Sequence, residues 1–312
     1  SHLMGNIFLK DIYRKHPSFR QLEEVLASGD NKPVNITGLT GSSRAVVMAG
    51  ALSEMPTTHL VLLPEKEDAA YFYNDLISLL GEDNIFFFPS TYKRSVMYEQ
   101  TEPANIVLRT EVLNYLGAGH RKSIIVTYPE SLMEKVISKT NLKKNTFHVK
   151  KGDKLSIEFL EEVLREYNFR RTDFVYEPGQ YSVRGSITDL FSYSSDMPYR
   201  IDFFGEEVDS IRTFNPDDQL SVSILNEIQI IPDIHDITIQ EINDTFLDFI
   251  PPSSVIWADN FSYIIEKTDN IYLQTRSRGE KGEITDRRDI IITGRRMEEL
   301  CHRHRVIEFG RG

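Results

Sequence analysis

The sequence predicts an α/β protein with a small α+β module in its middle. Over residues 1–136, short apolar runs alternate with helical patterns, which is typical of a parallel sheet covered by helices. After residue 136 the pattern changes to one helix followed by several short strands. From about residue 220 the apolar runs of sheet strands return.

The first part of the chain contains two strand–helix pairs. The run 33–37 predicts a strand that leads into Gly38, and a helical pattern follows at 45–52. The continuous apolar run 59–63 is typical of a strand buried on both faces. The next helix is expected at 65–80, with Gly81 in its C-cap position.

The same alternation continues with a strand at 85–88, a helix at 104–116 and a strand at 123–127. The pattern changes after about Val136. Residues 139–154 hold six lysines and one acid, Asp153. These lysines predict a solvated surface, and the alternative is a patch that contacts DNA.

The middle module begins with a strand at 146–150 and an amphipathic helix that we expect Ser156 to cap. Short β-like runs follow it, and Gly205-Glu206 is a plausible hairpin turn between the last two. The runs lie at 181–183, 187–191, 199–204 and 208–214. Beyond this module, strands are expected in the apolar runs 228–231, 254–257 and 289–292.

Composition excludes several classes of protein. The chain has 312 residues, 40% hydrophobic and 27% charged, which argues against disorder. It shows no apolar run long enough to cross a bilayer, so no membrane partner is expected. The single cysteine, Cys301, excludes a disulfide framework and predicts a cytoplasmic location. A net charge of −11 argues against strong nucleic-acid binding over the whole surface.

The segment Gly38-Leu39-Thr40-Gly41-Ser42-Ser43-Arg44-Ala45 lies between a predicted strand and a predicted helix, as a phosphate-binding P-loop does. In the pattern G-x-x-x-x-G-K-[ST], Ser43 replaces the second glycine, Arg44 the lysine and Ala45 the hydroxyl residue. Alanine offers no oxygen to Mg²⁺, and arginine fits the lysine position poorly. The segment therefore predicts a degenerate P-loop that does not hydrolyse nucleotide, and the alternative is an ordinary Gly/Ser turn.

Two longer segments carry a family resemblance: YEPGQYSVRGSITDLF at 176–191 and PYRIDFFGEEVDSIR at 198–212. They resemble the signature of UvrB and of the UvrB-like module that begins transcription-repair coupling factors (Mfd). UvrB keeps an intact P-loop and a long tyrosine-rich DNA hairpin, whereas this P-loop is degenerate and the segment 88–100 is short. The sequence is therefore more similar to the Mfd module; the rival interpretation is an active P-loop ATPase, UvrB itself.

The resemblance implies a degenerate P-loop NTPase-like domain, similar to UvrB domains 1a and 1b, that is split by an insert. Its parts would be a first lobe at 1–136, an inserted UvrA-binding domain at 137–218 and a returning lobe at 219–312. It further implies a non-catalytic adaptor that recruits UvrA by mimicking UvrB. ATP and Mg²⁺, RNA polymerase and double-stranded DNA would be bound by other parts of a longer protein, an ATP-dependent DNA translocase, and no cofactor is expected in this chain.

By motif position, the resemblance assigns UvrA contacts to Arg170 or Arg171, Arg184 and Phe191. Arginines suit carboxylate partners and an exposed aromatic suits an interface anchor. The alternatives are that the arginines form surface pairs with Glu161, Glu166 or Asp189, and that Phe191 lies in the core.

Two weaker candidates concern metals and carboxylates. Cys301, His302 and His304 fall within four residues, which matches no usual zinc spacing, so a helix end is the preferred interpretation and no metal is expected. The remaining acids are expected on the solvated face of the hairpin: Asp202, Glu206, Glu207 and Asp209.

Overall fold

The structure is a computed structural model of the chain, and it describes residues 34–37, 42–92, 102–235, 242–283 and 290–310. The chain divides into two compact units. Unit 1 comprises Ser1–Gln100, Ala118–Val136 and Asn243–Gly312, and unit 2 comprises Thr101–Gly117 and Ile137–Ile242. Among the described helices, none combines the length and the apolar character that a membrane span requires.

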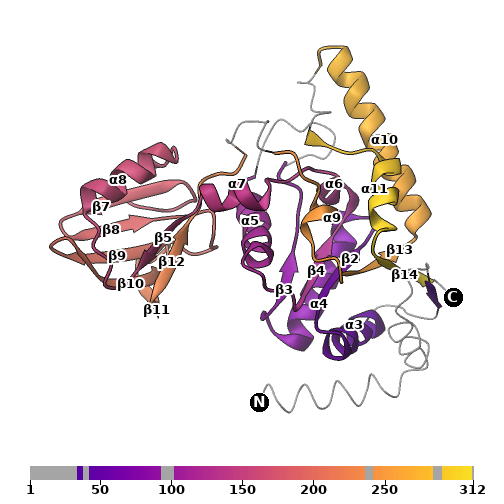
Figure 1. The fold of residues 1–312 in the computed structure, drawn as a ribbon, viewed down its shortest axis with the longest axis horizontal. Helices are drawn as coiled ribbons and strands as arrows, with labels where there is room; N and C mark the ends of the chain where they lie inside the picture. Colours follow the sequence, from indigo (N-terminus) through magenta and orange to yellow (C-terminus); the bar gives the residue numbers. More distant parts are fainter. Residues whose placement is uncertain (1–33, 38–41, 93–101, 236–241, 284–289, 311–312) are drawn as a thin grey trace. The chain divides into compact units, whose positions relative to one another are not determined.

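Unit 1 is built on a six-stranded sheet in which every pairing is parallel (Figure 1). The continuous apolar runs explain this, since three strands are buried along their whole length and need cover on both faces: Thr58–Leu62, Ser123–Thr127 and Val255–Asp259. In sheet order the strands are β1 (Val34–Thr37), β14 (Arg305–Gly310), β13 (Val255–Asp259), β2 (Thr58–Leu62), β4 (Ser123–Thr127) and β3 (Ile85–Phe87).

Helices cover this sheet. Apolar side chains of α3 (Ser42–Glu54) and α4 (Lys66–Leu80) form one core with Val61, Val126 and Trp257 of the strands. The other helices of unit 1 are α6 (Pro129–Leu132), α9 (Phe246–Phe249), α10 (Phe261–Glu280) and α11 (Gly294–Cys301). The predicted α/β class with a parallel sheet is thereby confirmed.

Unit 2 contains a second six-stranded sheet, antiparallel except where β6 pairs with β7. Its strands, in sheet order, are β11 (Ser221–Leu225), β10 (Glu207–Phe214), β9 (Tyr199–Phe204), β8 (Ile187–Leu190), β7 (Gln180–Arg184) and β6 (Arg170–Arg171). A separate pair joins β5 (Phe147–Lys150) to β12 (Glu227–Ile230), and the helices are α5 (Pro103–Gly117), α7 (Lys139–Lys144) and α8 (Ile157–Glu166).

The two faces of the antiparallel sheet differ in polarity. On β9, Tyr199, Ile201 and Phe203 are buried, whereas the alternate residues Arg200 and Asp202 are more exposed. Leu160, Val163 and Leu164 of α8 are also buried, and the hydroxyl of Ser156 accepts a hydrogen bond from the backbone N–H of Phe159, as the cap prediction requires. The face that carries Arg200 is called the outer face below.

Two predicted strands have a different outcome. The run 228–231 forms β12 in unit 2, where it pairs with β5 instead of joining the parallel sheet. In the run 289–292 Asp289 lies outside the described residues, and Ile291 makes only an isolated bridge to Glu134. Its apolar residues are nevertheless buried, so burial of an irregular segment explains the apolar run. The predicted domain boundaries stay a prediction.

Candidate docking face on the antiparallel sheet

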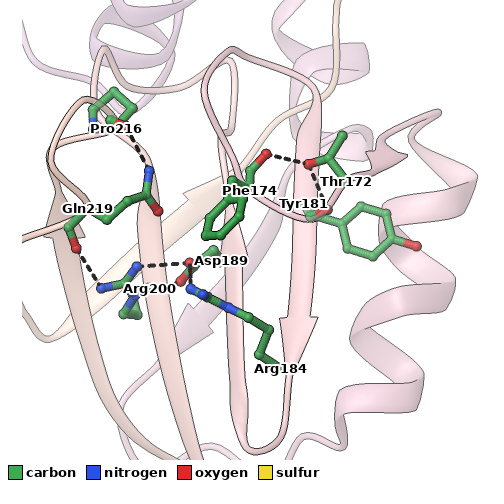
Figure 2. Close-up of polar contacts among 8 residues, drawn as sticks. All are labelled: Thr172, Phe174, Tyr181, Arg184, Asp189, Arg200, Pro216 and Gln219. Atoms are coloured by element: carbon green, nitrogen blue, oxygen red, sulfur yellow. Dashed lines mark hydrogen bonds and ion pairs between the residues drawn. The ribbon is translucent and has the colours of Figure 1, made fainter.

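Asp189 is the centre of the polar contacts on the outer face (Figure 2). Its side chain is 1% exposed, and it forms ion pairs with two arginines from neighbouring strands. Arg200 makes a two-point contact, with Nε 2.8 Å from Oδ1 and Nη2 3.0 Å from Oδ2. Arg184 donates from Nη2 to Oδ2 at 3.2 Å. The buried carboxylate is thus neutralised from both sides.

Arg184 remains accessible despite this ion pair. Its side chain is 49% exposed, and it lies at the end of β7, just before the turn in which Gly185 adopts a φ of 59°. A left-handed φ favours glycine, so the R-G step sets the turn that follows the arginine. The guanidinium carbon lies 5.4 Å from the centre of the Phe174 ring, within cation–π range.

Residues 172–179 form a loop that presents two exposed aromatic side chains, Phe174 at 46% and Tyr176 at 59%. Hydrogen bonds fix the loop: the hydroxyl of Thr172 donates to the carbonyl of Phe174 at 2.7 Å, and the side-chain oxygen of Gln180 accepts from the N–H of Tyr176 at 2.9 Å. Ordered, exposed aromatic groups beside an arginine are typical of protein interfaces. The motif resemblance did not single them out, although Phe174 lies two residues before the quoted signature and Tyr176 is its first residue.

Arg170 and Arg171 form β6 and are 70% and 57% exposed. Arg170 lies 3.6 Å from Glu177 and Arg171 lies 3.5 Å from Glu161. Both arginines therefore form surface ion pairs and remain accessible from solvent, so a docking role for either stays a prediction.

The structure places Phe191 in the core. Its side chain is 6% exposed and packs in a small cluster with Val175 and Phe214. This burial matches the alternative stated above, that Phe191 lies in the core. Arg200, which motif comparison also did not single out, lies with its guanidinium carbon 4.4 Å from the centre of the Phe214 ring and donates to the carbonyl of Gln219 at 3.0 Å.

The degenerate P-loop segment is only partly described. Gly38, Thr40 and Gly41 lie outside the described residues, and Ser42 and Ser43 begin α3. Arg44 forms an ion pair with Asp259, the last residue of β13, with 3.0 Å between Nη1 and Oδ2. Ala45 is fully buried. The cation at the lysine position of the P-loop pattern is therefore paired with a carboxylate of the same unit.

A second ion-pair cluster lies among segments that follow parallel strands of unit 1. Lys267 of α10 contacts Glu65, after β2, at 2.9 Å and Glu130, after β4, at 3.0 Å. The carboxyl ends of parallel strands form the edge where α/β proteins bind ligands. Burial raises the pKa of Glu130, while Lys267 opposes that rise. Lys267 is thus paired with both carboxylates at this edge of the sheet.

The other candidates are placed as follows. Cys301 is buried, and burial raises the pKa of its thiol. His304 Nε2 lies 3.0 Å from the carbonyl oxygen of Leu247, and the described residues contain no group of three or more metal-binding side chains. Asp202 accepts a hydrogen bond from Ser186, while the other three carboxylates of the hairpin are exposed: Glu206, Glu207 and Asp209.

The antiparallel sheet lies in the part of the chain that is similar to known proteins. A family model described as the UvrB interaction domain matches residues 147–235, which run from β5 past β12. A transcription-repair-coupling factor of Bacillus subtilis is 30% identical over 198 residues, covering 63% of this chain and 17% of the relative. The chain is similar to the UvrB-like module of transcription-repair-coupling factors. The resemblance stated from the sequence is thereby confirmed.

Two further relatives are similar to this chain. The transcription-repair-coupling factor of Haemophilus influenzae is 29% identical over 182 residues, 58% of this chain and 16% of the relative. The UvrABC system protein B of Thermotoga maritima is 24% identical over 235 residues, 71% of this chain and 35% of the relative. The chain thus spans only a minor part of the length of the curated relatives that it matches.

Proposed function

We propose that this chain is an adaptor module that binds UvrA, as part of a transcription-repair coupling factor. The observation that carries the proposal is the position of Arg184: it lies within the matched UvrB interaction domain and is half-exposed on an ordered face with two exposed aromatic side chains. Arginine and aromatic side chains are the residues that most often dominate binding energy at interfaces. Arg170 and Arg171 are proposed to lie at the edge of the same contact.

The proposed adaptor does not hydrolyse nucleotide, and we infer that unit 1 is a degenerate P-loop NTPase-like domain without a cofactor. The Arg44–Asp259 ion pair supports this, because the cation is already engaged and Ala45 has no oxygen for Mg²⁺. The rival, an active ATPase like UvrB, would need a cation free to reach the β- and γ-phosphates.

The remaining parts of the proposal concern the longer protein. It would be cytoplasmic, hydrolyse ATP, translocate on double-stranded DNA and bind RNA polymerase through other domains, and so bring UvrA to polymerase stalled at a lesion. The relatives' name, transcription-repair-coupling factor, supports a role in coupling transcription to repair, and the chain's small share of their length leaves room for the other domains.

Binding to purified UvrA by isothermal titration calorimetry tests the proposal. The whole chain should bind UvrA and compete with UvrB for one site. Arg184→Ala should weaken binding at least ~30-fold, as expected for a charged interface anchor of about 2 kcal/mol. The matched control is Arg296→Ala, since Arg296 of α11 is similarly exposed at 44% and belongs to unit 1. Absence of binding by the unmodified chain would reject the proposed function.

A further inference from the structure

Strand β11 and the residue before it carry an exposed apolar strip of three side chains. Leu220 is 67% exposed, Val222 is 60% exposed and Ile224 is 81% exposed, and they alternate with Ser221 and Ser223. Isolated apolar residues on a surface are ordinary, whereas neighbouring ones on a single strand indicate contact with another surface. The segment 220–225 contains no charged residue, in a chain whose net charge is −11.

Ile224 of this strip lies on the same face of the sheet as the proposed docking surface. Ile224 is paired with Arg212, Arg212 with Arg200, and Arg200 with Asp189. Directly paired residues of antiparallel strands point to the same side of the sheet. This row therefore places Ile224 on the outer face. At the next step the β10–β11 register shifts, since Phe214 lies opposite Ser221, so Val222 is the extra residue of this irregularity and regular strand alternation ends there.

The distance across this face fits one interface. Four strand spacings of ~4.8 Å separate β11 from β7, so the strip and Arg184 lie about 20 Å apart. A typical stable interface covers ~800 Å² on each partner, a patch roughly 30 Å across. Arg184 and Arg212 supply polar contacts in such a patch, and the strip supplies the apolar contacts that ion pairs alone do not provide.

The orientation of the strip decides between possible occupants. Strand pairing along the edge of β11 with a second copy would leave Ile224 on the outer face, still in water. Face-to-face packing of two copies would also cover the strip and is the alternative that sedimentation tests below. UvrA is the preferred occupant because the strip lies within residues 147–235, which the UvrB interaction domain model matches. A partner that covers the outer face buries the strip and reaches Arg184 from the same direction.

We infer that the UvrA contact extends across the outer face from Arg184 to Ile224 and continues along β11 over the exposed Val222 and Leu220, and that UvrA presents apolar side chains to this strip and carboxylates to Arg212. The inference rests on the proposed UvrA binding and names the part of the surface that supplies its apolar contacts.

The test uses the whole chain and purified UvrA in calorimetry. The variant Val222→Thr/Ile224→Thr keeps β-branched side chains, which suit strands, and removes apolar surface. It should weaken UvrA binding at least ~10-fold with an unchanged thermal midpoint. Leu273→Thr is the matched control, because Leu273 is 47% exposed on α10 of unit 1, and it should bind like the unmodified chain.

The outcomes separate this inference from the proposed function. If the unmodified chain does not bind UvrA, both fail. If Arg184→Ala weakens binding but the Val222/Ile224 variant binds like the unmodified chain, the strip is outside the interface and only this inference is overturned. A third result also overturns it: sedimentation that shows a dimer for the unmodified chain and a monomer for the Val222/Ile224 variant would assign the strip to a second copy.

Discussion

Arg200 holds the carboxylate of Asp189 through two hydrogen bonds, 2.8 Å to Oδ1 and 3.0 Å to Oδ2. Only 18% of the Arg200 side chain and 1% of the Asp189 side chain are exposed, so this pair is largely screened from water. The half-exposed Arg184 approaches the same carboxylate from the other side. One arginine therefore supports the fold of the outer face while the other remains available to a partner.

The first prediction separates these two roles. Arg200→Ala should lower the free energy of unfolding by about 3 kcal/mol, because the buried Asp189 loses its two-point contact. Arg184→Ala should lower it by less than about 1 kcal/mol, as expected for an exposed ion pair. Urea denaturation of both variants checks this, and a larger loss of stability for Arg184→Ala would contradict the assignment.

The second prediction concerns nucleotide. Because Arg44 is paired with Asp259 and Ala45 offers no hydroxyl, Mg-ATP should bind no more tightly than about 1 mM, and hydrolysis should not exceed background. Calorimetry and a phosphate-release assay measure the two quantities. Micromolar binding that Arg44→Ala abolishes would favour the ATPase alternative.

The third prediction concerns Glu111 in unit 2. Burial, together with the nearby Asp196, raises the pKa of its carboxyl to about 7 from the usual 4.5. Between those values the folded chain holds a proton that the unfolded chain releases, so unfolding free energy should fall as pH rises, by up to about 1.4 kcal/mol per pH unit. Glu111→Gln should remove this slope and stabilise the chain at pH 8. Denaturation at pH 5 and pH 8 measures it, with Glu162→Gln, a change of an exposed carboxyl on α8, as the control. An unchanged slope in Glu111→Gln would reject the prediction.

The fourth prediction concerns His59 in unit 1, where pH acts in the opposite direction. Burial lowers the pKa of His59 to about 4 from 6.5. Below pH 6.5 His59 therefore binds a proton in the unfolded chain but stays neutral in the folded chain. The free energy of unfolding should decrease as the pH falls from 6.5 towards 4. Trp257, the single tryptophan, donates to Nδ1 of His59 at 3.1 Å, so its fluorescence reports this unfolding directly. A Trp257 transition midpoint that stays constant over this range would contradict the assignment.

Local features were predictable wherever neighbouring residues decide them. The cap at Ser156 and the buried alternation of Ile201 and Phe203 follow from patterns within a few residues. The position of Phe191 was left open, because its burial depends on Val175 and Phe214, which belong to a loop and to another strand. A short strand pattern cannot indicate which of its faces such a loop will cover.

Contacts distant in sequence account for the rest. Arg44 and Asp259 are 215 positions apart, and no local pattern connects them. Similarly, β12 pairs with β5 although about 80 residues separate them, so an apolar run expected in the parallel sheet became part of unit 2. The exposed aromatic side chains of the loop were missed because an apolar residue predicts burial unless the fold shows otherwise.

The order of strands in the parallel sheet dictates when each unit can be completed during synthesis. β1 pairs with β14, and β14 in turn with β13, so the first described strand gains its neighbour only after residues 305–310 have been made. Every segment of unit 2 leaves the ribosome before that point. The antiparallel sheet of unit 2 can therefore form while unit 1 is still incomplete, and a chain shortened before residue 255 would lack the strands that connect β1 to β2.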